Sequence, residues 1–428
     1  MMMMPSLRNR KQITSYILQT IFFFLVLGDQ YATLWAFNIE LEPNLSWQLY
    51  YEDNPQITGH FSNRYVPDLK FKAEGPRLVI EGRTGLTVYR YVSDEDKIFD
   101  QTDRRYDIQS TFRISPRSEA MLGAGYSRDS DPLRNFTGEQ GVDSGTFVRQ
   151  SQVSITKNYN ASYQYMLSPK STLGLLFSYA NFSTNVSSGS PVYSYNLIYE
   201  YILSNKTSIN LSLGYSNLKF NYTIAEDLLG FELDTYSITT GLSHEFNKTC
   251  KLSFAVGVNF SDTKNQRAIF EEDSETGEQI IVGTETITSS TTDPNFDLEL
   301  EKTYYHTTFR LKAGQALYTD PETGRTYPTQ NFGFKMDYDF TSKLIGSLGW
   351  SFYNNKASAG DYNNRVDYEY ESNFTTVSLA YKYKPNISLS LAYSRTDSKD
   401  IKPINTKTIR NYVFLQCTFA LQRSFIVR

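Results

Sequence analysis

One phrase recurs along the chain and limits the folds it can adopt. In residues 201–220, the polar stretch Ser204-Asn205-Lys206-Thr207 precedes a run in which large apolar residues alternate with Ser, Asn and Gly. Successive side chains of a strand point to opposite faces, so this run predicts a strand with one uncharged apolar face and one small, polar face. The apolar residues are Ile209, Leu211, Leu213 and Tyr215. Such a face suits lipid tails and, at its tyrosine, the headgroup boundary.

The same phrase returns often enough to predict the number of strands. Copies begin at Ile114, Leu167, Leu203, Phe246, Phe340 and Tyr383, and two weaker copies turn at Glu74-Gly75-Pro76 and near Lys302-Thr303. Each turn joins two strands, so eight turns predict 16 strands. The unpaired runs at each end, residues 41–51 and 409–421, raise the number to 18, with 16 as the alternative.

An even number of strands lets the first and last pair, so that no sheet edge faces lipid. The other connections are mostly long: residues 52–63, 129–146, 225–233, 263–294, 320–327, 354–365 and 396–408. Outer-membrane barrels keep short turns on the periplasmic side and long loops outside. We therefore predict an all-β fold, a closed antiparallel transmembrane β-barrel of about 18 strands. A soluble β-sandwich or propeller is the alternative, because repeated hairpins also occur there.

Composition agrees with this prediction and divides the chain into two parts. The 33 Tyr and 28 Phe fit aromatic girdles at the membrane interfaces. The mean hydropathy of −0.44 excludes a helical membrane protein in the body of the chain. Residues 1–36 are expected to be a signal peptide, with a basic start at Arg8, Arg10 and Lys11 and an apolar run over residues 21–27. The barrel is expected over residues 37–428.

Several short stretches resemble a known family. They are Tyr51-Glu52-Asp53-Asn54, Val66-Pro67, Ala73-Glu74-Gly75-Pro76-Arg77-Leu78, Ile114-Ser115-Pro116-Arg117 and Tyr126-Ser127-Arg128-Asp129-Ser130-Asp131-Pro132. They resemble the outer-membrane β-barrel porin family of Gram-negative bacteria, including barrels associated with PEP-CTERM and exopolysaccharide loci. The resemblance implies the cell outer membrane and transport, either as a passive channel for small solutes or in exopolysaccharide export, with no catalytic residues. The chain departs from the usual pattern at its end, where Ile426-Val427-Arg428 replaces a terminal aromatic residue.

The inward positions of the predicted strands supply charges for a water-filled lumen. The candidates are Lys70, Lys72, Glu81, Arg83, Asp107, Arg113, Glu200, Arg310, Lys312, Lys335, Asp337, Asp339 and Lys382, together with Asp68 and Glu299. Basic and acidic residues are nearly balanced, which predicts weak ion selectivity. The alternative is that these charges only pair across strands.

Other chemistry has little support in the sequence, and no cofactor or metal is expected. The acidic stretch over residues 271–278 loosely resembles a calcium loop, although its ligand pattern is incomplete. It could also fold inward and narrow the pore. Of the three histidines, His60, His244 and His306, His60 is expected in an external loop near Asp53 and Ser62, the least poor arrangement for a hydrolase.

The function predicted from the residues is therefore a non-enzymatic channel. The alternatives are a non-conducting surface barrel that binds a partner or polysaccharide through its long loops and, less favoured, an outer-membrane hydrolase. The expected partners are outer-membrane lipid, the barrel-assembly machinery and polysaccharide or small solutes. The net charge of −4 argues against nucleic acid.

Overall fold

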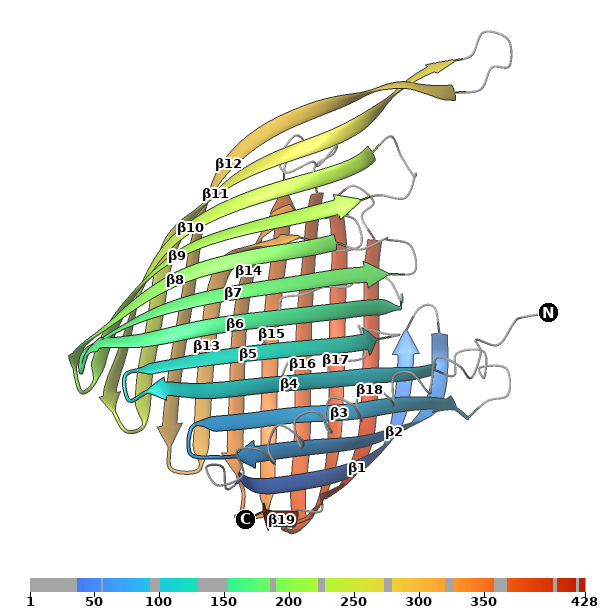
Figure 1. Ribbon diagram of the computed structural model, residues 1–428. Coiled ribbons are helices and arrows are strands. Elements are labelled where there is room, and N and C mark those ends of the chain that lie inside the picture. Colours follow the sequence, from blue (N-terminus) through green and yellow to red (C-terminus); the bar gives the residue numbers. More distant parts are fainter. Residues whose placement is uncertain are drawn as a thin grey trace.

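A single antiparallel sheet closes on itself to form the molecule (Figure 1). The computed structural model describes residues 37–54, 57–92, 101–129, 153–184, 190–221, 228–272, 279–319, 326–357, 368–402, 406–420 and 423–427. Strand β1 pairs with β2 along one edge and with β18 and then β19 along the other. Because β18 and β19 follow one another along the same edge of β1, they occupy one position in the wall. The barrel thus has 18 strand positions, as predicted.

The strands run in chain order around the wall. Their bounds are β1 Phe37–Asn54, β2 Ile57–Glu74, β3 Leu78–Tyr91, β4 Gln101–Ser115, β5 Ser118–Asp129, β6 Ser154–Ser168, β7 Ser171–Thr184, β8 Ser190–Ser204, β9 Thr207–Asn221, β10 Leu228–Asn247, β11 Cys250–Glu272, β12 Gln279–Tyr304, β13 Thr307–Thr319, β14 Thr326–Asp339, β15 Leu344–Ala357, β16 Tyr368–Lys384, β17 Ile387–Lys402, β18 Thr406–Ala420 and β19 Arg423–Val427. The described part of the chain contains no helix long and apolar enough to cross a membrane.

The recurring phrase forms the short turns because its hydroxyl side chains hold the backbone locally. Between β4 and β5, the Ser115 hydroxyl accepts a hydrogen bond from the Arg117 amide at 3.2 Å and shares one with Ser118 at 2.7 Å. Ser168 and Ser204 repeat this geometry before β7 and β9. Such local bonds stabilise a tight turn. All eight predicted short turns are present, at one end of the barrel.

Several predicted boundaries are wrong. The turn expected near Lys302-Thr303 lies at Tyr305-His306, where Tyr305 has a positive φ of 51°. The connection expected over residues 52–63 is much shorter, because β1 runs to Asn54 and β2 begins at Ile57. Strand β17 likewise extends to Lys402, and only residues 403–405 separate it from β18. Polar composition alone does not end a strand whose neighbour continues to supply backbone hydrogen bonds.

The largest correction concerns residues 263–294, predicted to be a loop. Strand β11 continues to Glu272 and β12 begins at Gln279, and the two pair throughout. β11 pairs with β10 only as far as Arg267, and β12 pairs with β13 only from Phe296 onward. The excess forms a two-stranded ribbon that rises past the neighbouring strands (Figure 1). We refer to it as the β11–β12 ribbon.

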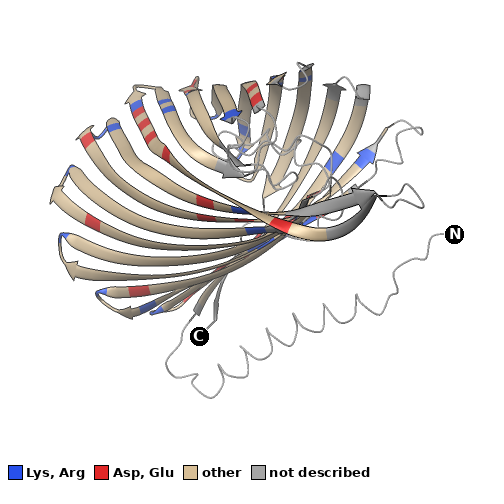
Figure 2. Cartoon of the chain, turned by 90° about the horizontal axis from the view of Figure 1, so that it is seen from above, with Lys and Arg blue, Asp and Glu red and all other residues tan. Residues whose placement is uncertain are grey.

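The outward face of the wall is apolar across the middle of the strands. Leu122, Leu175 and Leu391 are 63%, 53% and 51% exposed. Figure 2 shows charged residues concentrated toward the strand ends, with uncharged wall between them. Exposed apolar surface on this scale marks contact with a partner or a membrane. A continuous band around a closed barrel fits lipid.

A row of outward tyrosines borders this band on the side of the long connections. We call it the tyrosine girdle: Tyr106, Tyr126, Tyr159, Tyr179, Tyr193, Tyr195, Tyr215 and Tyr236. Neighbouring rings contact one another, with centroids 5.9 Å apart for Tyr106 and Tyr126 and 5.1 Å apart for Tyr215 and Tyr236. Aromatic rings with a polar tip prefer the boundary between hydrocarbon and headgroups.

Beyond the girdle the apolar side chains move to the opposite face. Leu218 is buried in a cluster with Phe231 and Leu233, and Leu317 of β13 packs against that cluster. The neighbouring position Asn217 pairs with Asp234 on the outward face. The apolar and polar faces of β9 and β10 are therefore exchanged beyond Tyr215.

Candidate functional site

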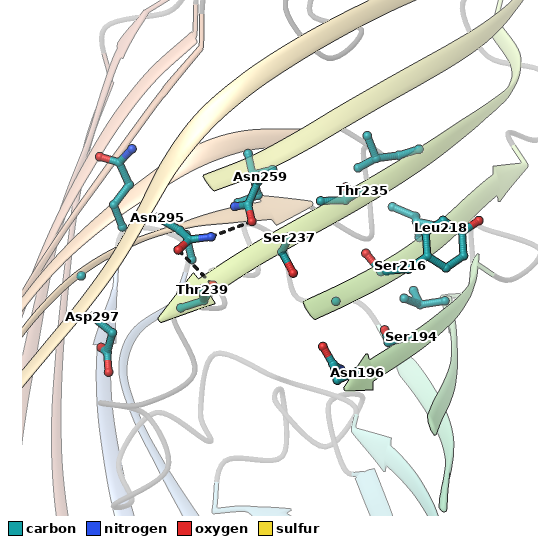
Figure 3. A pocket seen from close by; sticks show the side chains of 18 of the residues that line it. Ser194, Asn196, Ser216, Leu218, Thr235, Ser237, Thr239, Asn259, Asn295 and Asp297 are labelled. Carbon is teal, nitrogen blue, oxygen red and sulfur yellow. Dashed lines mark hydrogen bonds between the residues drawn. The ribbon is translucent and has the colours of Figure 1, made fainter. Parts of the chain in front are cut away.

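A pocket of about 680 Å³, lined by both polar and apolar side chains, lies against the inner face of the wall, by which we mean the face opposite the exposed apolar band (Figure 3). Strands β7 to β14 all contribute to it, and most of its polar side chains are hydroxyls and amides. The hydroxyls and amides drawn and labelled are Ser194, Asn196, Ser216, Thr235, Ser237, Thr239, Asn259 and Asn295, and Asp297 adds a carboxylate. Only a concave surface lets residues from so many neighbouring strands converge on one space.

Hydrogen bonds fix part of this surface. The Asn295 amide donates to Asn259 Oδ1 at 2.7 Å, and the Thr239 hydroxyl donates to Asn295 Oδ1 at 3.4 Å. A Cβ atom at Gly214 would lie 2.7 Å from Asn196 Oδ1, so glycine at this position leaves room for the amide of the neighbouring strand. These groups form an ordered surface of uncharged donors and acceptors.

A second, charged pocket of about 440 Å³ lies on the inner face of β1 to β6. It is lined by five of the predicted residues, Lys70, Lys72, Glu81, Arg83 and Asp107. The Arg83 guanidinium donates to Asp68 at 2.7 Å, and the Asp68 carboxylate is nearly buried. Lys72 lies 3.9 Å from Glu81.

A third group of predicted charges meets on β12 to β15. Arg310 pairs with Asp337 at 3.2 Å and with Glu301 at 2.8 Å. Lys335 also approaches Asp337, at 3.7 Å, and the Ser347 hydroxyl donates to the same carboxylate at 2.6 Å. Lys312 lies 3.9 Å from Glu299 on the neighbouring strand. Here the charges form a compact network.

The remaining candidates lie apart from these groups. Arg113, Glu200, Asp339 and Lys382 form no ion pair with another residue that the structure describes. The backbone amides of Arg113, Asp339 and Lys382 bond to carbonyls in the neighbouring short-turn regions. These three residues therefore belong to the short-turn end of the wall.

The prediction missed several charges that the fold adds to these groups. Arg105 pairs with Asp107 at 2.6 Å, and Glu74 pairs with Lys72 at 2.9 Å. Glu40 and Glu42 line the charged pocket from β1. All four carry the inward parity of their strands, so strict application of the two-residue period would have found them.

The candidate hydrolytic and calcium residues occupy other places. His244 shares a hydrogen bond with the Thr207 hydroxyl at 2.9 Å and packs edge-on against Phe246. His306 lies in the turn before β13. The prediction that His60 lies in a loop is wrong, because His60 lies within β2 opposite Glu52. The side chain of His60 lies outside the described residues. The side chains of residues 271–278 also lie outside the described part.

Comparison with known proteins gives likenesses of overall shape. No protein-family model and no curated protein sequence matches the chain. The outer membrane protein opdK from Pseudomonas aeruginosa aligns with a TM-score of 0.44 and 10% identity, over 90% of this chain and 99% of that chain. OccAB2 from Acinetobacter baumannii gives 0.45 and 11%, over 90% and 98%. OpdQ from Pseudomonas aeruginosa gives 0.47 and 9%, over 90% and 99%. The function is therefore inferred from the residues of this chain.

Proposed function

We propose that this chain is a porin-like barrel of the cell outer membrane and acts as a passive channel for small solutes. The supporting observation is the contrast between the two faces of one closed wall, apolar outside and polar inside. Barrels with eight strands are filled by side chains, whereas those with 16 to 18 leave an aqueous channel. A closed 18-position ring with a hydrated inner face suits conduction rather than catalysis.

The inner wall favours small hydrophilic solutes. Its charged groups contain both signs in contact, as in the Arg83–Asp68 and Arg310–Asp337 pairs, which supports weak ion selectivity. The pocket between β7 and β14 offers hydroxyls and amides of the kind that bind hydroxylated molecules such as sugars, beside the single carboxylate of Asp297. A conduit linked to exopolysaccharide export is the finer form of this proposal, and it draws on the family resemblance together with these hydroxyls and amides.

Conductance of the folded protein in a planar bilayer tests the proposal. We expect discrete current steps and a small reversal potential in a potassium chloride gradient. Swelling of vesicles that contain the protein, measured in isotonic solutions of neutral sugars, would show passage of uncharged solutes. Folded, inserted protein without current would contradict the channel and favour a non-conducting surface barrel.

A further inference from the structure

Three basic side chains follow the tyrosine girdle on β4, β5 and β6. Arg104, Arg128 and Lys157 are each the next outward-facing residue after a girdle tyrosine, on the side of the long connections. The tyrosines are Tyr106, Tyr126 and Tyr159 respectively. We call these three residues the basic ridge.

The ridge brings like charges together. Arg104 and Arg128 are direct partners in the β4–β5 register, and directly opposed side chains have Cβ atoms about 4.5–5.5 Å apart. Arg128 pairs with Ile155, so Lys157 is its diagonal neighbour, about 7–8 Å away. Opposed like charges destabilise a sheet unless an anion neutralises them.

Few groups among the described residues can neutralise the positive charges of the basic ridge. Among the described outward residues of β3 to β6 beyond the girdle there is no carboxylate. Arg128 donates to the Thr102 carbonyl oxygen at 2.9 Å, which holds the guanidinium at the wall but leaves its charge uncompensated. Arg104 and Lys157 are both exposed.

The corresponding positions elsewhere around the girdle are different. The residues that follow Tyr179, Tyr215 and Tyr236 are Asn181, Asn217 and Asp234. The lysines found there have acidic partners, with Lys219 3.0 Å from Glu232 and Lys264 3.7 Å from Asp234. Among the girdle strands compared, outward basic residues without neighbouring carboxylates thus occur on β4 to β6.

We propose that the basic ridge binds the phosphate of a lipid headgroup in the outer leaflet of the membrane, on the side of the long connections. Arginine donors match phosphate geometry, and basic residues close to a membrane surface attract anionic lipids. The position favours a lipid over a free phosphate, because the ridge lies immediately beyond the tyrosines that mark the headgroup level. This proposal rests on membrane insertion as proposed above.

Binding of a phosphorylated lipid to the purified full chain, folded in detergent micelles, tests the ridge. The probe is an acylated glucosamine disaccharide that carries two phosphates, compared with the same lipid after removal of both phosphates. Bound lipid per barrel is counted by native mass spectrometry at physiological ionic strength. We expect Arg104→Gln combined with Lys157→Gln to weaken binding of the phosphorylated lipid about tenfold and to leave the dephosphorylated lipid unaffected.

The matched control is Lys219→Gln combined with Lys264→Gln, which removes two outward basic residues that already have acidic partners. Its affinity should stay within about twofold of wild type. Equal binding by the ridge variant and wild type, or equal loss in both double variants, would overturn the proposal. Competition by inorganic phosphate at concentrations similar to the lipid would show a free-phosphate site and would also overturn it. The conductance of the ridge variant is measured as well. Unchanged conductance together with unchanged lipid binding would overturn the lipid site but leave the proposed channel intact.

Discussion

At the scale of single residues, the outward face of β9 tests whether the wall contacts hydrocarbon. Leu211 is 43% exposed and lies between Leu213 and Ile209 on the apolar face. Leu211 pairs with Tyr199 on β8 and with Thr240 on β10, so the position is inside the sheet rather than at an edge. A charge at this site has no aqueous route along the outward face.

The substitution Leu211→Arg should lower the free energy of unfolding in lipid vesicles by about 2–4 kcal/mol, because an arginine on the lipid face near the bilayer centre must be desolvated. Denaturant titration monitored by tryptophan fluorescence measures the change. Ser212→Arg, one residue along and on the opposite face, is the control and should cost much less. Equal losses for both variants would mean that the two faces are misidentified.

Individual charges on the inner wall should affect ion selectivity. Arg310 contacts both Glu301 and Asp337, so its removal leaves two carboxylates with less compensation. We expect Arg310→Gln to shift the reversal potential in a salt gradient toward cation selectivity. The exposed turn residue Lys343 provides the control, as Lys343→Gln. An unchanged reversal potential in Arg310→Gln would indicate that this network lies outside the path of the ions.

At the scale of elements, the β11–β12 ribbon is separable from the barrel. Beyond Arg267 the ribbon residues of β11 pair only with β12, and β12 joins β13 only at Phe296. Its polar composition, rich in Thr and Ser over residues 284–292, predicts a loop if it is considered alone. Pairing between the two segments instead produces an extended hairpin, which explains the error in the sequence prediction.

Replacement of residues 268–284 by an Asn-Gly turn should leave the barrel folded, since the described residues in this range make no ladder with β10 or β13. Retention of the heat-dependent shift in gel migration measures this. Conductance then distinguishes two roles: a larger current than wild type would show that the ribbon narrows the pore, and an equal current would show that it does not. Loss of the folded band would contradict the independence of the ribbon.

At the scale of the whole molecule, closure depends on the ladders that join β1 to β18 and β19. Register runs without interruption from Asn44 opposite Ala420 to Asp53 opposite Asn411. Without these bonds both strands would present unpaired backbone groups to lipid, which is costly. The seam between the two ends of the chain is therefore as important as any internal hairpin.

Leu415→Pro tests the seam. Leu415 pairs with Leu49 of β1 and with Leu391 of β17, and proline removes one backbone donor from these ladders. We expect a markedly smaller fraction of protein with the compact gel migration of a folded barrel. Leu415→Ala keeps the backbone donor and should retain most of the folded band. Comparable folding of the proline variant and wild type would contradict the closed seam.

Much of this architecture follows from local sequence. The alternation of Ile209, Leu211 and Leu213 with polar neighbours determines two faces, because side chains of a strand repeat every two residues. The Ser-x-x-Ser turns, such as Ser115 to Ser118, are likewise stabilised by bonds within four residues. Eight short turns of differing sequence and two end runs sufficed to predict 18 strand positions.

Which side chains meet depends on contacts between strands. Arg310 reaches Asp337, and Arg104 lies opposite Arg128, because of the register between neighbouring strands. That register depends on pairing around the entire closed wall, and a periodic pattern within one strand does not specify it. Pairing between β11 and β12 alone extended these two strands beyond the barrel. Local residue patterns thus specify the faces and the short turns, whereas pairing between strands produces the charged networks, the ribbon and the basic ridge.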